Sequence, residues 1–329
     1  MVKNVNVNEL LFSDLLVKEP VRETNNGLTD EKRGKFILTG SRGCGKSTVL
    51  ASRENDSFNT KNPAILTRFD GAGLFGTKEG KYFNKHIMQH YYEVIMCKKF
   101  LDHIKEFYPQ LFYTKFGNLN GFVEKKLKEL DNYINDAIYK DLTIEHQLFS
   151  GEVLSEVVSL FRQGLSAESL TLMIDRFDWT HNSDPRVQEI LKNYFSMFEK
   201  VIITSDDPTL STDKKKVAGL REKGFDIVTV DYASDLDIVK QIVERRFELD
   251  EDTQPRFPIE QITEEDYLSL MERCGGNIDT ILESFMYAEG LHKWDSRKDI
   301  HTVLEEASRQ KVKDLKQYRK MVKPPKLHL

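Results

Sequence analysis

The chain has 329 residues and a mass of 38.3 kDa, so it can fold as roughly two domains with a full hydrophobic core and no disulfide or metal staple. Its 53 acidic and 48 basic residues leave a net charge of −5, which excludes a chain that is basic throughout and coats nucleic acid. The three cysteines, Cys44, Cys97 and Cys274, lie far apart, which excludes a disulfide framework and favours a reducing, cytoplasmic location.

The N-terminal extension, residues 1–34, is polar apart from a short apolar patch. It lacks the apolar core of a signal peptide, and no apolar run in the chain approaches the roughly 18 residues that a membrane span needs. We therefore expect neither secretion nor a membrane partner.

Five short apolar runs in the next part of the chain predict buried strands. The first, residues 35–39, ends at a Gly-rich loop, and a helix is expected to begin near Lys46. The other runs cover residues 64–67, 170–174, 201–204 and 226–230. Runs that are apolar nearly throughout are typical of parallel strands covered by helices on both faces. We predict an α/β core over residues 35–230 with a five-stranded, mainly parallel sheet.

Helical periodicity dominates the remaining regions. Between about residues 73 and 168, side chains such as Phe100, Ile104 and Phe107 recur at helical spacing, which predicts a helical insertion with these residues in its core. Residues 231–290 show three amphipathic patterns and predict a helical lid. The last segment, residues 291–329, contains a helix expected from about Asp299 to Val322, because Pro324 and Pro325 then stop it.

A phosphate-binding loop is the strongest motif in the sequence. Residues 40–47 read GSRGCGKS, an unbroken G-x-x-x-x-G-K-[ST] (Walker A) pattern between a predicted strand and a predicted helix, which is the context that this P-loop motif requires. Glycines let successive N–H groups face phosphate oxygens, and the following helix adds a partial positive charge. Lys46 is expected to reach the β- and γ-phosphates, and Ser47 to bind Mg²⁺. The predicted nucleotide-binding residues are Gly40, Ser41, Arg42, Gly43, Cys44, Gly45, Lys46, Ser47 and Thr48.

Two acidic residues follow the third predicted strand. Asp175 ends the run LTLMID, which places it at the carboxyl edge of the sheet, where ligands bind, and we expect it to organise Mg²⁺ with Ser47. Many P-loop ATPases carry a glutamate directly afterwards, but here that residue is Arg176, so Asp178 is the candidate base for water. A structural role for Asp178 stays open, and it would make turnover slow. Thr204, at the end of the fourth strand, is expected to touch the γ-phosphate or the attacking water.

The order of these elements resembles the AAA+ and STAND superclass of P-loop ATPases, including origin-recognition-like and bacterial or archaeal STAND-type ATPases. The resemblance extends from Lys35 to Ala288 apart from the helical insertion. It rests on GSRGCGKS, LTLMIDRFD, VIITSDDP and DIVTVDYASDLDIVKQIVERRF followed by CGGNIDTIL. It implies that the helix start at Asn277 faces the nucleotide. No arginine matches the AAA+ sensor-two position, and Ile278 replaces the proline usual in STAND ATPases.

The same resemblance implies an arginine finger supplied by a neighbouring copy, and therefore a homo-oligomer. Arg221, just before the fifth strand, is the first candidate, and Arg245 and Arg246 on the first lid helix are rivals. Such a finger stabilises charge on the transferred phosphoryl group. Surface ion pairing is the alternative for all three arginines.

Basic residues are concentrated near the C-terminus. Residues 309–326 carry eight basic residues and one acid, a net charge of +7 against about −12 for the rest of the chain. Residues 309–329 are therefore a candidate contact for DNA or an effector protein. A solvated helix end is the alternative.

Together these features predict an ATP-binding, Mg²⁺-dependent ATPase, a P-loop hydrolase that acts as a nucleotide-driven switch or motor on a protein or DNA partner. The predicted catalytic residues are Lys46, Asp175, Asp178, Thr204 and Arg221, and the predicted metal ligands are Ser47 and Asp175. Two alternatives stay open: a non-hydrolysing regulatory ATP switch, and a DNA-binding replication or mobile-element factor.

Overall fold

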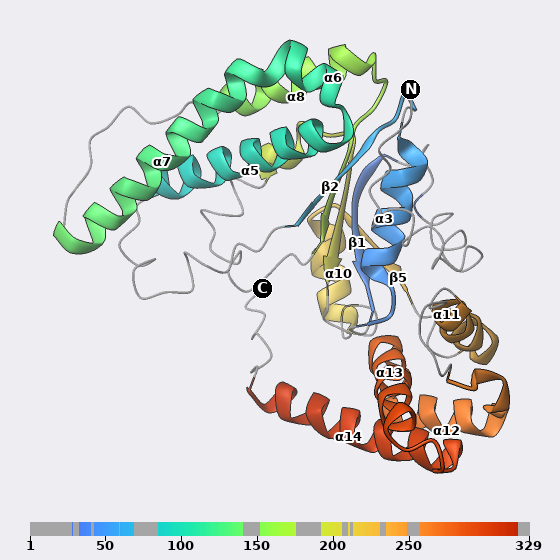
Figure 1. Cartoon of the computed structure of the whole chain (residues 1–329). Coiled ribbons are helices and arrows are strands. Elements are labelled where there is room, and N and C mark those ends of the chain that lie inside the picture. Colours follow the sequence, from blue (N-terminus) through green and yellow to red (C-terminus); the bar gives the residue numbers. More distant parts are fainter. Residues whose placement is uncertain are drawn as a thin grey trace.

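The fold is available as a computed structural model of the whole chain (Figure 1). The structure describes residues 28, 33–40, 43–58, 60–68, 85–140, 152–175, 192–205, 210, 213–230, 235–248 and 257–321.

A five-stranded parallel sheet forms the centre of the molecule. Its strands are β1 (Gly34–Thr39), β2 (Ala64–Arg68), β3 (Thr171–Asp175), β4 (Lys200–Ser205) and β5 (Phe225–Thr229). Their order across the sheet is β2-β3-β4-β1-β5, and each adjacent pair is parallel. The predicted α/β class and the five predicted strands are confirmed. One strand, β4, separates β1 from β3, so the carboxyl ends of these three strands lie next to one another.

Helices cover both faces of the sheet, as the apolar strands predicted. Alternate residues of β1 point to opposite faces: Phe36 and Leu38 join the hydrophobic cluster under α3 (Lys46–Ser57), and Ile37 joins the cluster on the other face. That second cluster includes side chains of α5 (Lys85–Phe107), α8 (Glu152–Leu165) and α10 (Lys214–Glu222). Full burial of each large apolar side chain contributes about 1.5–3 kcal/mol, so the two clusters fix the strand register.

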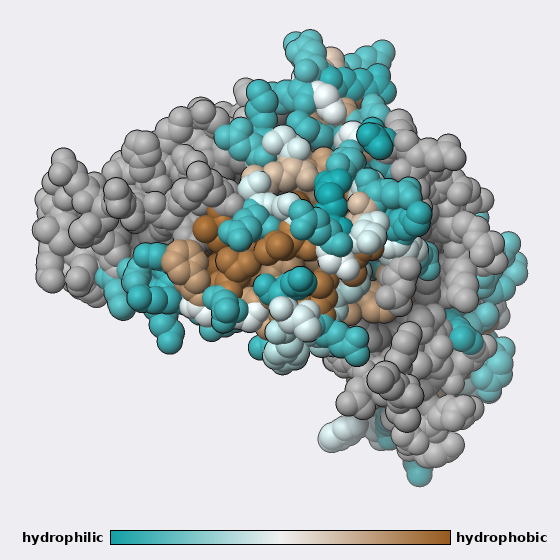
Figure 2. Space-filling view, turned by 90° about the horizontal axis from the view of Figure 1, so that it is seen from above, coloured by the Kyte–Doolittle hydropathy of each residue, from teal (hydrophilic) through white to brown (hydrophobic). Residues whose placement is uncertain are grey.

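The described part of the segment between β2 and β3 is helical, apart from Tyr108 and residues 166–170. It contains α5, α6 (Pro109–Leu111), the π-helical turn η2 (Phe112–Phe116), α7 (Gly117–Lys140) and α8. Phe100 and Ile104 are fully buried, as expected, and the rings of Phe100 and Tyr108 pack against Phe161 of α8 at centroid distances of 5.3 and 5.2 Å. Figure 2, which views the molecule from above, shows hydrophobic residues gathered in the middle of that face with hydrophilic residues around them.

A partly buried polar contact connects this helical segment to α3. Glu54 of α3 accepts a hydrogen bond from the backbone N–H of Leu66 in β2 at 2.8 Å, and its Oε1 lies 3.3 Å from Nδ1 of His103 in α5. Burial lowers the pKa of His103 to about 3, so the imidazole is neutral at physiological pH and this contact is not an ion pair. The side chain of Glu54 therefore links α3 to both β2 and α5.

Four C-terminal helices share a core of their own below the sheet in Figure 1. They are α11 (Leu236–Glu248), α12 (Glu264–Cys274), α13 (Ile278–Trp294) and α14 (Ile300–Met321), with a short 3-10 turn, η5 (Ile259–Gln261), before α12. Tyr267, Phe285 and Val303 belong to this one cluster. The predicted lid boundary at residue 290 lies within α13, and the core continues into α14. Among the described helices, none is both long and apolar enough to cross a membrane.

Candidate functional site

The glycine-rich loop joins the carboxyl end of β1 to the N-terminus of α3. Gly43 and Gly45 adopt φ angles of +80° and +96°, and Gly45 is the N-cap of α3. These left-handed conformations are strained for residues with a Cβ atom. The first N–H groups of α3 point out of the helix end without intrahelical partners, so they can bind an anion there. Ser41 and Arg42 lie outside the described residues.

Lys46 brings a positive charge into this loop. Its side chain is only 6% exposed, and its Nζ donates a hydrogen bond to the carbonyl oxygen of Gly40 at 3.0 Å. The Sγ of Cys44 lies 3.8 Å from the same Nζ, and Cys44 is buried. The loop thus curls back over its own lysine, and the ammonium group is held beside the N-terminus of α3.

Two hydroxyl groups converge on the carboxylate at the end of β3. Ser47 Oγ and Thr204 Oγ1 each donate to Oδ1 of Asp175 at 3.1 Å. Asp175 is 2% exposed, and Thr204 is also buried. Because β3, β4 and β1 are neighbours, these residues meet at one sheet edge although Ser47 and Asp175 are 128 positions apart in the sequence. All three residues were expected in one site from the sequence, and the structure brings them together.

The N-terminus of α13 packs against the loop. A Cβ atom on Gly43 would lie 2.7 Å from Oδ1 of Asn277 and 2.9 Å from Cγ of Asp279. Asn277 is the buried N-cap of α13, and its Oδ1 accepts hydrogen bonds from the N–H and hydroxyl of Thr280 at 2.9 and 3.0 Å. This helix start was expected near the nucleotide from the family resemblance, whereas Asp279 was not among the predicted site residues. An acid in the first turn of a helix ordinarily complements the helix dipole, and the sequence gives no signal that it also lies against the loop.

Replacing Gly43 by alanine tests whether the close approach of α13 requires a glycine at this position. A second glycine variant controls for the general effect of replacing glycine by alanine. We expect Gly43→Ala to lower the free energy of unfolding by about 1–3 kcal/mol, because the new Cβ is strained at a positive φ and collides with Asn277. Gly219 is a matched control, since it lies inside α10 with open space around its Cα. Gly219→Ala should stabilise the protein by about 0.5–1 kcal/mol. Urea unfolding of the two variants measures the difference, and a Gly43→Ala protein as stable as wild type would contradict the described contact.

Arg221 lies apart from this site. It is an exposed residue in the last turn of α10, four residues before the strand β5 begins. In a parallel sheet the start of β5 is at the edge opposite the carboxyl ends, so Arg221 does not join Lys46 and Asp175 within one chain. Arg245 and Arg246 are exposed near the end of α11. For each of these three arginines, a role as an arginine finger on a neighbouring copy remains a prediction.

The described residues limit the protein ligands available to a metal ion. Among them, no group of three or more His, Cys, Asp or Glu side chains could hold a metal. A divalent cation at this edge would have Ser47 and Asp175 as protein neighbours and would need further oxygen ligands from phosphate and water, as Mg²⁺ commonly does. Asp178, the predicted base, lies outside the described residues.

Comparisons with known proteins add no family assignment. No protein-family model matches the chain, and no curated protein shows significant similarity to it. The loop, the buried lysine and the hydroxyl–carboxylate cluster are therefore the observations that bear on function.

Proposed function

We propose that the chain binds a nucleoside triphosphate with Mg²⁺, preferentially ATP, and hydrolyses it as a conformational switch. One observation carries this proposal: Lys46 lies at a glycine loop and helix N-terminus whose next residue, Ser47, is hydrogen-bonded to the buried Asp175. A triphosphate needs a concave set of N–H donors, a cation and a metal-organising carboxylate at one place. The preference for ATP comes from the resemblance to AAA+ and STAND ATPases.

Each residue has a distinct part in this proposal. The loop N–H groups and Lys46 bind the phosphate oxygens, and the Ser47 hydroxyl and Asp175 carboxylate flank the metal position. Mg²⁺, when bound, neutralises charge on the β- and γ-phosphates. Thr204 already bonds to Asp175 and is one strand away from the loop, so it is suited to orient the attacking water. Asp178 is proposed as the base that accepts a proton from that water.

The contact between α13 and the loop supports a switch. Asn277 and Asp279 lie against Gly43, and a carboxylate beside an anion site is disfavoured once phosphates arrive. Binding of a triphosphate would therefore bias the position of α13, and the shared core of α11–α14 would move with it. A ligand shifts such an equilibrium only by its differential affinity for the two arrangements. Action on a partner and self-association belong to this proposal through the family resemblance.

Two measurements test the proposal. The first is calorimetric titration with ATP, once in the presence of Mg²⁺ and once with EDTA in place of Mg²⁺. The second is an assay of phosphate release. We expect binding of ATP that Mg²⁺ strengthens, and slow but measurable phosphate release. ATP binding with no release would favour the non-hydrolysing switch. Failure of the wild-type protein to bind any nucleoside triphosphate would overturn the proposal. AMP, which lacks the β- and γ-phosphates, serves as the control ligand and should bind weakly.

A further inference from the structure

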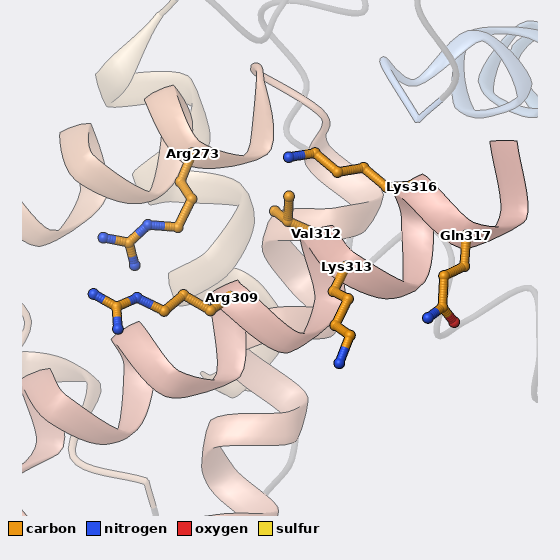
Figure 3. Close-up of a pocket in the computed structure, with 6 residues that line it drawn as sticks. All are labelled: Arg273, Arg309, Val312, Lys313, Lys316 and Gln317. Atoms are coloured by element: carbon orange, nitrogen blue, oxygen red, sulfur yellow. The ribbon is translucent and has the colours of Figure 1, made fainter. Parts of the chain in front are cut away.

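A basic groove lies between α12 and α14, away from the sheet edge. Arg273, Arg309, Val312, Lys313, Lys316 and Gln317 line a hollow of about 570 Å³. In Figure 3 the guanidinium groups of Arg273, from α12, and Arg309, from α14, lie close together and point in the same direction. From the sequence alone, the basic surface was expected to consist of residues of the C-terminal segment. The fold brings Arg273 of α12 next to them.

One carboxylate is shared between the two arginines of this groove. Oε1 of Glu305 lies 3.3 Å from Nη2 of Arg273 and 2.7 Å from Nη2 of Arg309. Arg273 Nη1 also donates to Ser308 Oγ at 2.7 Å, which fixes the guanidinium plane. Two positive charges against one negative charge leave an excess positive charge at this point.

The lysines of the groove add to that excess. Lys313 and Lys316 are exposed, and within the part of the chain that the structure describes neither lies within ion-pair distance of a carboxylate. Positions 309, 313 and 316 share one face of α14 because they are four and three residues apart. Along the axis they extend over roughly 10 Å, or about two helical turns.

We propose that this groove binds the phosphate backbone of a DNA duplex, without reading its sequence. Guanidinium forks and lysine ammonium groups are the usual partners of backbone phosphates. Lysine is depleted in protein–protein interfaces, where aromatic anchors are enriched. Among the described residues that line this groove, four side chains are basic and none is aromatic. The same lack of a stacking platform disfavours a single-stranded ligand.

The groove is separate from the proposed nucleotide site. The groove residues come from α12 and α14, whereas the nucleotide site uses the loop, β3 and β4. DNA binding can therefore be measured in the absence of nucleotide, so failure of ATP binding and failure of DNA binding are separate results.

Fluorescence anisotropy with a labelled DNA duplex, titrated at several salt concentrations, tests the proposal. Each lysine–phosphate contact contributes about 0.9 to the slope of log affinity against log salt. We expect Lys313→Gln/Lys316→Gln to lower that slope by roughly 1.8 and the affinity roughly 10- to 100-fold near 0.1 M salt. Lys125→Gln/Lys128→Gln on α7 is the matched control, because it removes two exposed lysines with the same spacing and should change neither quantity.

A gain of affinity provides a test that a folding defect cannot imitate. Glu305→Gln removes the carboxylate that pairs with Arg273 and Arg309, so we expect tighter DNA binding and a steeper salt slope. Unchanged affinity in both the lysine and Glu305 variants, or no DNA binding by the wild-type protein, would overturn the proposal.

Competitors distinguish the kind of polyanion. Unlabelled duplex DNA should displace the probe, and equal competition by duplex RNA would support a contact limited to phosphates. Polyglutamate of equal charge that competes as well as duplex DNA would overturn the proposal in favour of an acidic protein segment. Better competition by single-stranded DNA than by duplex would overturn it as well.

Discussion

Replacing Lys46 by alanine is expected to lower the affinity for ATP roughly 10- to 150-fold, because hydrogen bonds to charged groups contribute about 1.5–3 kcal/mol each. Lys46 Nζ donates a hydrogen bond to the carbonyl oxygen of Gly40 and so lies at the loop. The substitution removes the positive charge beside the helix N-terminus while leaving the backbone donors in place. Calorimetric titration of the variant with Mg²⁺ and ATP measures the loss, and phosphate release should fall with it.

Lys200 supplies a closely matched control for this experiment. It is also a buried lysine, and its Nζ donates to the backbone carbonyl of Leu28 at 2.8 Å. It begins β4, however, and so lies at the sheet edge opposite the loop. Lys200→Ala should reduce stability through the same loss of a buried contact but leave ATP affinity near that of wild type. Equal ATP affinity in the Lys46 variant and in wild type would rule out the loop as the phosphate site.

The strands were predictable because the strands of a parallel sheet covered on both faces are continuous apolar runs in the sequence. Each strand must be apolar on both sides, so runs such as residues 201–204 can be recognised without any three-dimensional information. The P-loop was predictable for a related reason, since its chemistry requires particular residues at adjacent positions. These are local constraints, and local constraints can be recognised along the chain.

The lateral arrangement was not predictable in the same way. Nothing in the sequence of β4 indicates that it lies between β1 and β3, yet this position is what brings Thr204 to Asp175. Similarly, Glu54 and His103 have the appearance of ordinary helix residues until α3 and α5 are placed against β2. Contacts of this kind depend on how distant elements pack, and a periodic pattern reports only which face of an element is buried.

The carboxylate at the end of β3 offers the sharpest test of hydrolysis. We expect Asp175→Asn to lower the rate of phosphate release roughly 100- to 1000-fold, a loss comparable with removal of one preorganised electrostatic group. Asparagine keeps a carbonyl oxygen that can accept from Ser47 and Thr204, so the fold and those two hydrogen bonds should persist. ATP binding in EDTA should change little, whereas the strengthening of binding by Mg²⁺ should disappear.

Asp178→Ala separates the metal-organising role from the proton-accepting role. If Asp178 is the base, its removal should slow phosphate release while the Mg²⁺-dependent gain in ATP affinity is retained, because the charge of Asp175 beside Ser47 is intact. Thr204→Val, which removes one donor to Asp175 at nearly constant volume, should give an intermediate loss. Retention of full Mg²⁺-dependent hydrolysis by Asp175→Asn would contradict the assigned site, because no other described carboxylate is hydrogen-bonded to Ser47.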